Sequence, residues 1–127
     1  MKLEPISQYI EDNTNLELGV NLFTHSMPPD VNEGVLVVTE SAGNRVDHEV
    51  IGVYLGRFQT IIRSQNYGTG TARAYEVFNL LNMSEVDLTE YVVTYSRPRH
   101  TPHPIGGRST GDLIELSINF DLRYRDV

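Results

Sequence analysis

The chain has 127 residues, a length that suits one domain burying about two-thirds of the surface that its unfolded form exposes. It contains no cysteine, which excludes disulfides and thiolate metal sites, and no apolar run near the ~20 residues of a membrane helix. The net charge of −7 argues against a nucleic-acid-binding domain, because phosphate binding requires clustered cations. We therefore expect a soluble single domain over residues 1–127, made in the cytoplasm and without a membrane partner.

The N-terminal third is predicted to contain a helix and two strands. Apolar residues at helical spacing and an early proline predict a helix over about residues 4–13. A short strand is expected within residues 19–25. The paired prolines of residues 26–34 indicate a turn, because proline cannot donate to a strand ladder. The β-branched run at residues 35–40, apolar on both faces, is typical of a central strand.

The middle of the chain is harder to interpret. Residues 41–56 contain Gly43 and Gly56 with strand-forming residues between them, and we expect a projecting loop or an extra hairpin there. Residues 57–64 are predicted to form the next strand. Their apolar residues keep no clean period, so either face could be covered.

The clearest helix prediction lies in residues 71–83. Its apolar stripe at i, i+3, i+4 and i+7 consists of Ala74, Val77, Phe78 and Leu81. Gly68 and Gly70 disfavour helix before this stripe, so the helix is expected to begin near Thr69 or Thr71.

Two strands are predicted to close the chain. Residues 91–96 form the first, and the proline-rich residues 97–107 are expected to end its pairing. From Ile114 to Tyr124 apolar and polar residues alternate, which predicts a strand with its even-numbered face buried under the helices. The order α-β-β-β-α-β-β indicates an α+β fold: a single, mostly antiparallel mixed sheet with two helices packed on one face.

Residues that could carry chemistry do not converge on a site. His100 and His103 stand among prolines, whose extended backbone should make their side chains diverge, and zinc would need a further ligand. Asp112 and Glu115 are interpreted as solvated acids at a strand start. The "GTGTAR" of residues 68–73 lacks the lysine of a phosphate-binding loop. We predict no enzyme, no metal and no cofactor.

Three stretches together have a familiar order and spacing: "NLFTHSMPPDV", "RFQTIIRSQNYGTGTARAYEVFNLLN" and "HPIGGRSTGDLIELSINFDLRYR". They resemble bacteriophage tail terminator proteins, also called tail-completion or minor capsid proteins of long-tailed phages. The positions that carry the resemblance are Phe23, Met27, Pro28, Arg63, Tyr67, Leu81, Asn82, Pro104, Gly106, Arg108, Asn119 and Phe120. The resemblance runs from about residue 5 to residue 125.

The resemblance implies a structural virion protein without turnover. Such a protein forms a homohexameric ring on the end of the tail tube, stops tube polymerisation and provides the docking surface for the head-side connector. The implied partners are copies of itself, the tail tube protein and the head-completion or stopper protein, with DNA passing through without specific binding. The implied location is the tail–neck junction of the virion, after synthesis in the host cytoplasm.

Two groups of charged residues, and one strand, are predicted to serve such an assembly. Arginine suits interfaces because its guanidinium is planar and weakly hydrated. The arginines predicted to make subunit or partner contacts are Arg45, Arg57, Arg97, Arg99 and Arg108. The acids predicted to face the lumen or rim, where they would repel phosphates, are Glu33, Glu40, Asp47 and Glu49. The odd-numbered face or the edge of the last strand is expected to meet a neighbouring subunit.

Two alternatives stay open. The chain could be another ring-forming neck or tail tube protein, which in the case of a tube protein should polymerise alone into long cylinders. It could also be a small-molecule-binding or enzymatic α+β domain with a site around His100, His103 and Asp112.

Overall fold

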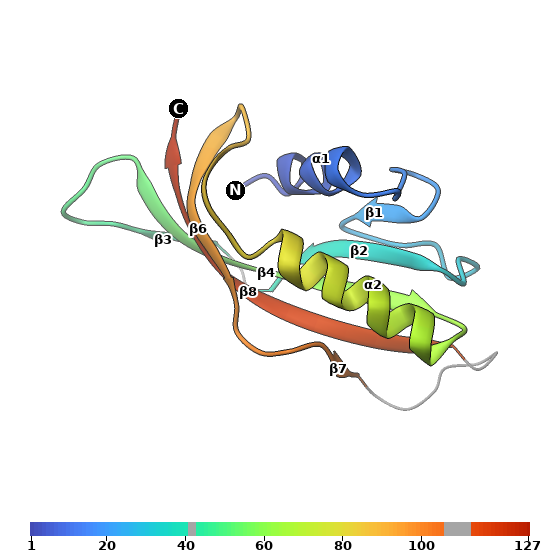
Figure 1. Ribbon diagram of the computed structural model, residues 1–127. Coiled ribbons are helices and arrows are strands. Elements are labelled where there is room, and N and C mark those ends of the chain that lie inside the picture. Colours follow the sequence, from blue (N-terminus) through green and yellow to red (C-terminus); the bar gives the residue numbers. More distant parts are fainter. Residues whose placement is uncertain (41–42, 106–112) are drawn as a thin grey trace.

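The computed structural model describes residues 1–40, 43–105 and 113–127. Its elements in chain order are α1 (Glu4–Asn13), β1 (Leu22–Thr24), β2 (Gly34–Thr39), β3 (Arg45–Val46), β4 (Val53–Ser64), α2 (Tyr67–Leu80), β5 (Met83–Asp87), β6 (Tyr91–Pro98), β7 (His103–Pro104) and β8 (Ile114–Asp126). Both helices lie on the same side of the sheet (Figure 1). Neither helix is long and apolar enough, among the residues described, to span a membrane.

The strands form a single mixed sheet in the order β1-β2-β4-β8-β6-β5, with β3 added to β4 and β7 added to β8. β1 pairs with β2 in parallel, and the other named pairs of the described chain are antiparallel. The predicted fold class is thus confirmed. The expected element order lacked three short strands, which are β3, β5 and β7.

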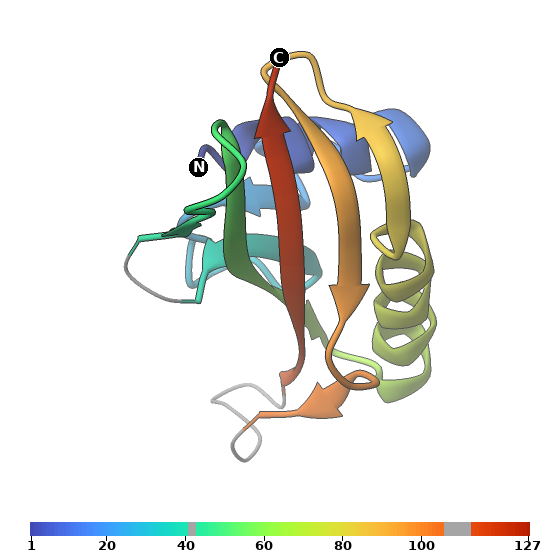
Figure 2. The ribbon, with the colours of Figure 1, turned by 90° about the vertical axis from the view of Figure 1, so that its left-hand side faces the viewer.

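β8 lies in the middle of the sheet, between β4 and β6 (Figure 2). Its even-numbered side chains are buried as predicted from Leu116 to Tyr124, while Ile114 at its start is only half-buried. Phe120 stacks on Phe58 of β4 with ring centroids 4.7 Å apart, in the centre of the core. The expectation that an edge of this strand is free is wrong, because β6 and β7 occupy the side that β4 leaves.

α1 has the predicted bounds. Its proline stands in the first turn, where a missing N–H costs no helical hydrogen bond, and Ile6 and Ile10 are fully buried. The helix ends at Thr14, whose hydroxyl donates to the carbonyl of Ile10 at 2.7 Å. A sequence pattern of three apolar residues was therefore sufficient to place this helix.

α2 begins earlier than predicted, at Tyr67, and includes both glycines. The Asn66 side chain accepts a hydrogen bond from the Thr69 N–H at 3.0 Å, which stabilises the helix start. Gly70 lies against β4, where an added Cβ would come within 3.0 Å of the Ser64 Cβ. The Asn66 cap stabilises the helix start, and the close approach to β4 leaves no room for a side chain at residue 70. Together they explain why this helix contains two glycines.

The segments around the long strands also differ from expectation. β4 begins at Val53 rather than near residue 57, and β3 pairs with its first residues. The resulting hairpin projects from one end of the molecule (Figure 1). Within residues 97–105, the described part of the proline-rich stretch, pairing does not end. The N–H groups of Arg99 and Ile105 donate to β8 carbonyls, and each of these residues follows a proline, which has no N–H to donate. β5 was missed because its exposure pattern shows no alternation.

Candidate interaction surfaces

The face of the sheet that points away from the helices carries paired charges, and we call it the open face. Figure 2 shows the strands of the sheet in front of α1. Arg57 pairs with Asp121 at 3.4 Å, and Arg99 pairs with Glu40 at 2.7 Å and with Asp121 at 3.9 Å. Other arginine–carboxylate pairs on this face join Arg63 to Glu115, Arg123 to Asp47 and Arg125 to Glu85. The odd-numbered side chains of β8 supply four of these charges, and all four are half-buried.

The strand register explains the centre of this network. Asp121 of β8 stands opposite Arg57 of β4 on one side and opposite Arg97 of β6 on the other. A groove of about 340 Å³ opens beside this triplet, lined by Arg45, Arg57, Tyr95 and Asp121 among others. The groove lining combines the cationic side chains of two arginines with a tyrosine ring and a carboxylate.

Four of the five arginines predicted to make contacts therefore gather on the open face. Arg45 and Arg57 line the groove, and Arg99 reaches it through Asp121. Arg97 lies 5.7 Å from the Tyr95 ring centroid and donates to the Met83 carbonyl and to the Ser84 hydroxyl. The fifth, Arg108, lies outside the described residues. Contact with another chain stays a prediction for all of them.

Glu33 and Glu40, which are two of the four predicted lumen acids, have partners among the described residues. Glu33 accepts hydrogen bonds from the Ser64 hydroxyl and the Gln65 N–H, each at 3.0 Å, and so joins the start of β2 to the β4–α2 junction. Its other oxygen lies 4.0 Å from the guanidinium of Arg73. Glu40 is held by Arg99. Their role in a lumen stays a prediction.

The other two acids belong to the turn of the β3–β4 hairpin, residues 47–52, which we call the hairpin tip. The Asp47 carboxylate accepts from the N–H of Val50 at 2.9 Å and of Glu49 at 2.8 Å, and Arg123 lies 3.5 Å away. These N–H groups, that of Val50 first, lower the pKa of Asp47 below its ordinary value. Among the residues described, the carboxylate of Glu49 has no partner and is exposed. Its place in a lumen stays a prediction too.

The two histidines are adjacent, so the expectation that they diverge is wrong. Their ring centroids lie 4.6 Å apart and their Nδ1 atoms 3.3 Å apart, because the chain turns between β6 and β7 and returns along β8. His100 Nδ1 contacts the Thr101 carbonyl, while its Nε2 accepts from the Asn119 N–H. Within the described residues no third His, Asp or Glu completes a metal site, and Asp112 lies outside them.

A larger pocket that we did not predict lies at the start of α2. It has a volume of about 640 Å³ and is lined by Leu16 of the loop after α1 and, on α2, by Gly68, Ala72, Arg73 and Glu76. We call it the helix pocket. The signal in the sequence was the pair of glycines before the helical stripe: Gly68 leaves the pocket open, since an added Cβ would contact only the Asn66 side chain.

The sequence matches the model of a family described as bacteriophage tail terminator protein, over residues 9–126. The chain belongs to this tail terminator family. The resemblance drawn from the sequence is thereby confirmed, and the chain is a structural protein of a phage tail. The family is a structural one, so it gives no support to the enzymatic alternative around the two histidines.

A solved structure agrees with this fold. A chain from the virion of a native gene transfer agent particle aligns with a TM-score of 0.64 and 16% identity, over 84% of the tail terminator chain and 80% of its own. A second solved chain has a TM-score of 0.46 and 15% identity, over 98% of this chain and 89% of its own. No curated protein matches the sequence.

Proposed function

We propose that the chain forms a homohexameric ring on the end of a phage tail tube, stops tube polymerisation there and provides the docking surface for the head-side connector. The observation that carries this proposal is the match to the tail terminator family over residues 9–126. The fold shared with a chain of a gene transfer agent virion supports a place in a virion. That place would be the tail–neck junction, reached after synthesis in the host cytoplasm.

The proposed partners are other copies of the chain, the tail tube protein and a head-completion or stopper protein. One domain over residues 1–127 would form each subunit, with the β3–β4 hairpin as a projecting part of it. The groove arginines Arg45, Arg57, Arg97 and Arg99 would contact a neighbour, because arginines on a tyrosine surface are typical of interfaces.

DNA would pass through the ring without specific binding. The net charge of −7 supports this, since a wall that attracted phosphates would slow passage. The proposed lumen or rim acids are Glu33, Glu40, Asp47 and Glu49, whose negative charge would repel a passing phosphate.

The experiment mixes the purified chain with growing tail tubes and images both by negative stain, beside light scattering of the chain alone. Tubes that carry one ring at an end and grow no further from it would support the proposal. Long cylinders formed by the chain alone would instead indicate a tube protein. Unchanged tube growth, or binding along the sides of the tubes, would contradict a terminating role.

A further inference from the structure

The hairpin tip, residues 47–52, is held in place by hydrogen bonds within the tip and to neighbouring strands. Asp47 accepts from two tip N–H groups, and its own N–H donates to the Val53 carbonyl at 3.0 Å. On the other side, the Asp126 N–H donates to the Gly52 carbonyl at 3.0 Å, which anchors the tip to the end of β8. A surface that is ordered before binding loses less conformational entropy when it binds.

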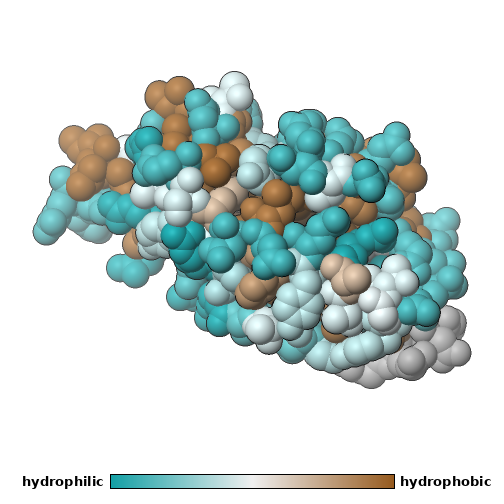
Figure 3. All heavy atoms as spheres, in the orientation of Figure 1, coloured by the Kyte–Doolittle hydropathy of each residue, from teal (hydrophilic) through white to brown (hydrophobic). Residues whose placement is uncertain are grey.

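This ordered tip presents apolar side chains to solvent. Ile51 is 99% exposed, and its neighbours Val46 and Val50 are 58% and 48% exposed. The end of the molecule that carries the hairpin shows hydrophobic atoms beyond the body of the chain (Figure 3). Single exposed apolar residues are common, but three together on a projecting turn indicate a contact surface. Glu49 adds an unpaired negative charge to it.

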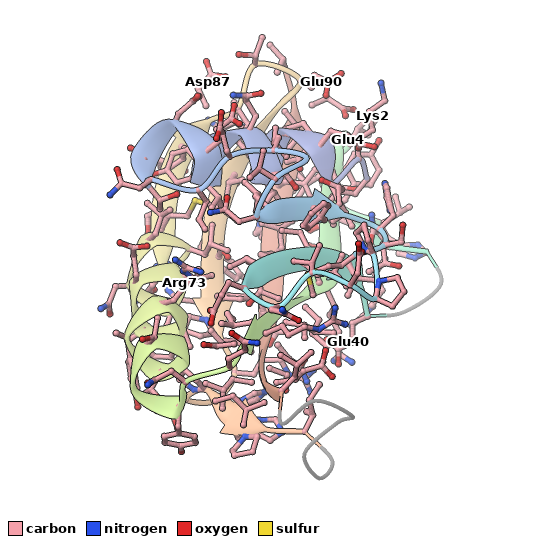
Figure 4. All side chains as sticks on the ribbon, turned by 90° about the vertical axis from the view of Figure 1, so that its right-hand side faces the viewer. Lys2, Glu4, Glu40, Arg73, Asp87 and Glu90 are labelled. Atoms are coloured by element: carbon pink, nitrogen blue, oxygen red, sulfur yellow. The ribbon has the colours of Figure 1, made fainter. Side chains whose placement is uncertain are left out.

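The helix pocket has the complementary properties. Its small residues Gly68 and Ala72 leave space, Leu16 supplies apolar surface, and Arg73 supplies a cation held only loosely by Glu33 at 4.0 Å. The first turn of α2 adds the partial positive charge of a helix N-terminus. Figure 4 shows Arg73 on α2 in the gap below α1. The pocket volume of about 640 Å³ exceeds that of the tip's isoleucine and glutamate side chains together.

The tip and the pocket lie at opposite ends of the subunit. The hairpin extends from one end in Figure 1, and the start of α2 with the loop after α1 lies at the other. A chain cannot fill its own pocket with its own tip in this arrangement. A contact between two different surfaces of identical copies is heterologous, and repeating it gives a closed ring when the rotation closes.

Resting on the ring of the proposed function, we propose that the hairpin tip of one copy inserts into the helix pocket of the next copy. Ile51 packs over Gly68 and Ala72, and the Glu49 carboxylate lies against Arg73. Each copy uses its tip once and its pocket once. Gly68 is then a residue of the contact, at a position where an added Cβ would meet only the Asn66 Oδ1, at 3.2 Å, within the chain.

The absence of cysteine in the sequence allows a direct test by crosslinking. Ile51→Cys/Ala72→Cys places two exposed thiols on the two surfaces, and mild oxidation should give a disulfide ladder that ends at the ring. The matched control is Ala72→Cys/Thr101→Cys, because Thr101 is an exposed residue between β6 and β7, away from the tip. The control should give only chance dimers.

The outcomes separate this inference from the proposed function. Rings without the ladder, or no ladder at any protein concentration, would overturn the contact and leave the terminator role to its own test. A ladder in a protein that does not stop tube growth would support the contact and contradict the terminator role. Loss of tube or connector binding by Ile51→Asp, with rings intact, would assign the tip to another tail protein and overturn the proposal.

A charge test uses the same two surfaces. Ile51→Asp and Ala72→Glu should each weaken association at least about tenfold, the second because it adds a carboxylate facing Glu49. Glu49→Arg combined with Ala72→Glu should recover most of the loss, whereas Thr101→Asp, away from both surfaces, should leave association unchanged. Recovery of association is the decisive result, because a second substitution would not rescue a variant that is misfolded. Failure of the double variant to recover association would count against the pairing.

Discussion

The side chain of Tyr91 connects the sheet to the N-terminal residues through a hydrogen bond. Its hydroxyl donates to the Lys2 carbonyl at 2.7 Å, and its ring is tilted on Tyr124 with centroids 5.0 Å apart. Burial, with a smaller contribution from Tyr124, raises the pKa of Tyr91 well above the ordinary tyrosine value. The neutral hydroxyl is therefore the form that the folded state requires.

Tyr91→Phe is expected to lower the free energy of unfolding by about 1 kcal/mol, because the Lys2 carbonyl loses its donor in a part-buried position. Since the folded-state pKa lies above the unfolded one, the contribution of Tyr91 is complete below pH 10.0 and is lost as the pH rises through the folded-state value. Urea unfolding at pH 7 and at increasing alkaline pH measures both effects.

The control is Tyr75→Phe, at an exposed tyrosine of α2 whose ring contacts Phe78. It should leave stability and its alkaline decline unchanged. If Tyr91→Phe declined with pH as steeply as the unsubstituted protein, the buried hydroxyl would not be the group responsible.

At the scale of the elements, α2 depends on Gly70 for its distance from β4. An alanine in this helix should gain about 1 kcal/mol of helix propensity over glycine. At Gly70 the added Cβ would come within 3.0 Å of the Ser64 Cβ, so the helix or the strand must move. Overpacking of this kind typically costs about 1–3 kcal/mol, which exceeds the gain.

Gly70→Ala is therefore expected to lower the midpoint of thermal unfolding. Gly68→Ala, whose Cβ would meet only the Asn66 Oδ1 at the end of a side chain, at 3.2 Å, should lower it less or raise it. Calorimetry of the two variants compares identical chemical changes in two surroundings. Equal rises in both would show that the helix can shift from β4 without cost.

The elements show which parts of the fold a sequence pattern determines. Leu3, Ile6 and Ile10 placed α1, and the alternation of residues 114–124 placed β8, because each pattern reports one buried face. The start of α2 depends on the Asn66 cap and on a contact with Ser64, which the glycines alone do not reveal.

Other elements have no such pattern. In β5 only Met83 is buried, and Glu85 has a positive φ of 50°, so no alternation identifies the strand. Among the candidate site residues, the arginines were selected by type. Their gathering around Asp121 follows from the register of β4, β6 and β8, which comes from long-range pairing and leaves no local signal. The helix pocket has a local signal in Gly68, but the loop after α1 that completes it comes from another part of the chain.

At the scale of the whole molecule, charge is separated between the two faces. On the helix side, a groove of about 370 Å³ between α1 and the β5–β6 turn carries the carboxylates of Glu4, Asp12, Asp87 and Glu90 (Figure 4). On the open face, arginines and carboxylates alternate and pair. The negative charge noted in the sequence therefore belongs largely to the helix side, whereas the arginines belong to the sheet.

This separation allows the role of the groove arginines to be tested without changing the net charge. The Arg57–Asp121 pair is about half-exposed, so the pair contributes little to stability, about 0–1 kcal/mol. Arg57→Glu/Asp121→Arg keeps the ion pair and exchanges its two ends. The new arginine stands opposite Arg97, and Arg99 loses its pair with Asp121 at 3.9 Å but keeps Glu40 at 2.7 Å. We expect thermal unfolding to change little and ring assembly, measured by light scattering and negative stain, to fall at least about tenfold. If Arg57 pairs only within its own subunit, assembly should be unchanged, because the ion pair is retained. If Arg57 contacts a carboxylate of the partner, assembly should fall, because that carboxylate then faces a like charge. Assembly of the exchanged variant at the level of the unsubstituted protein would therefore remove Arg57 from the proposed interface and confine it to the sheet.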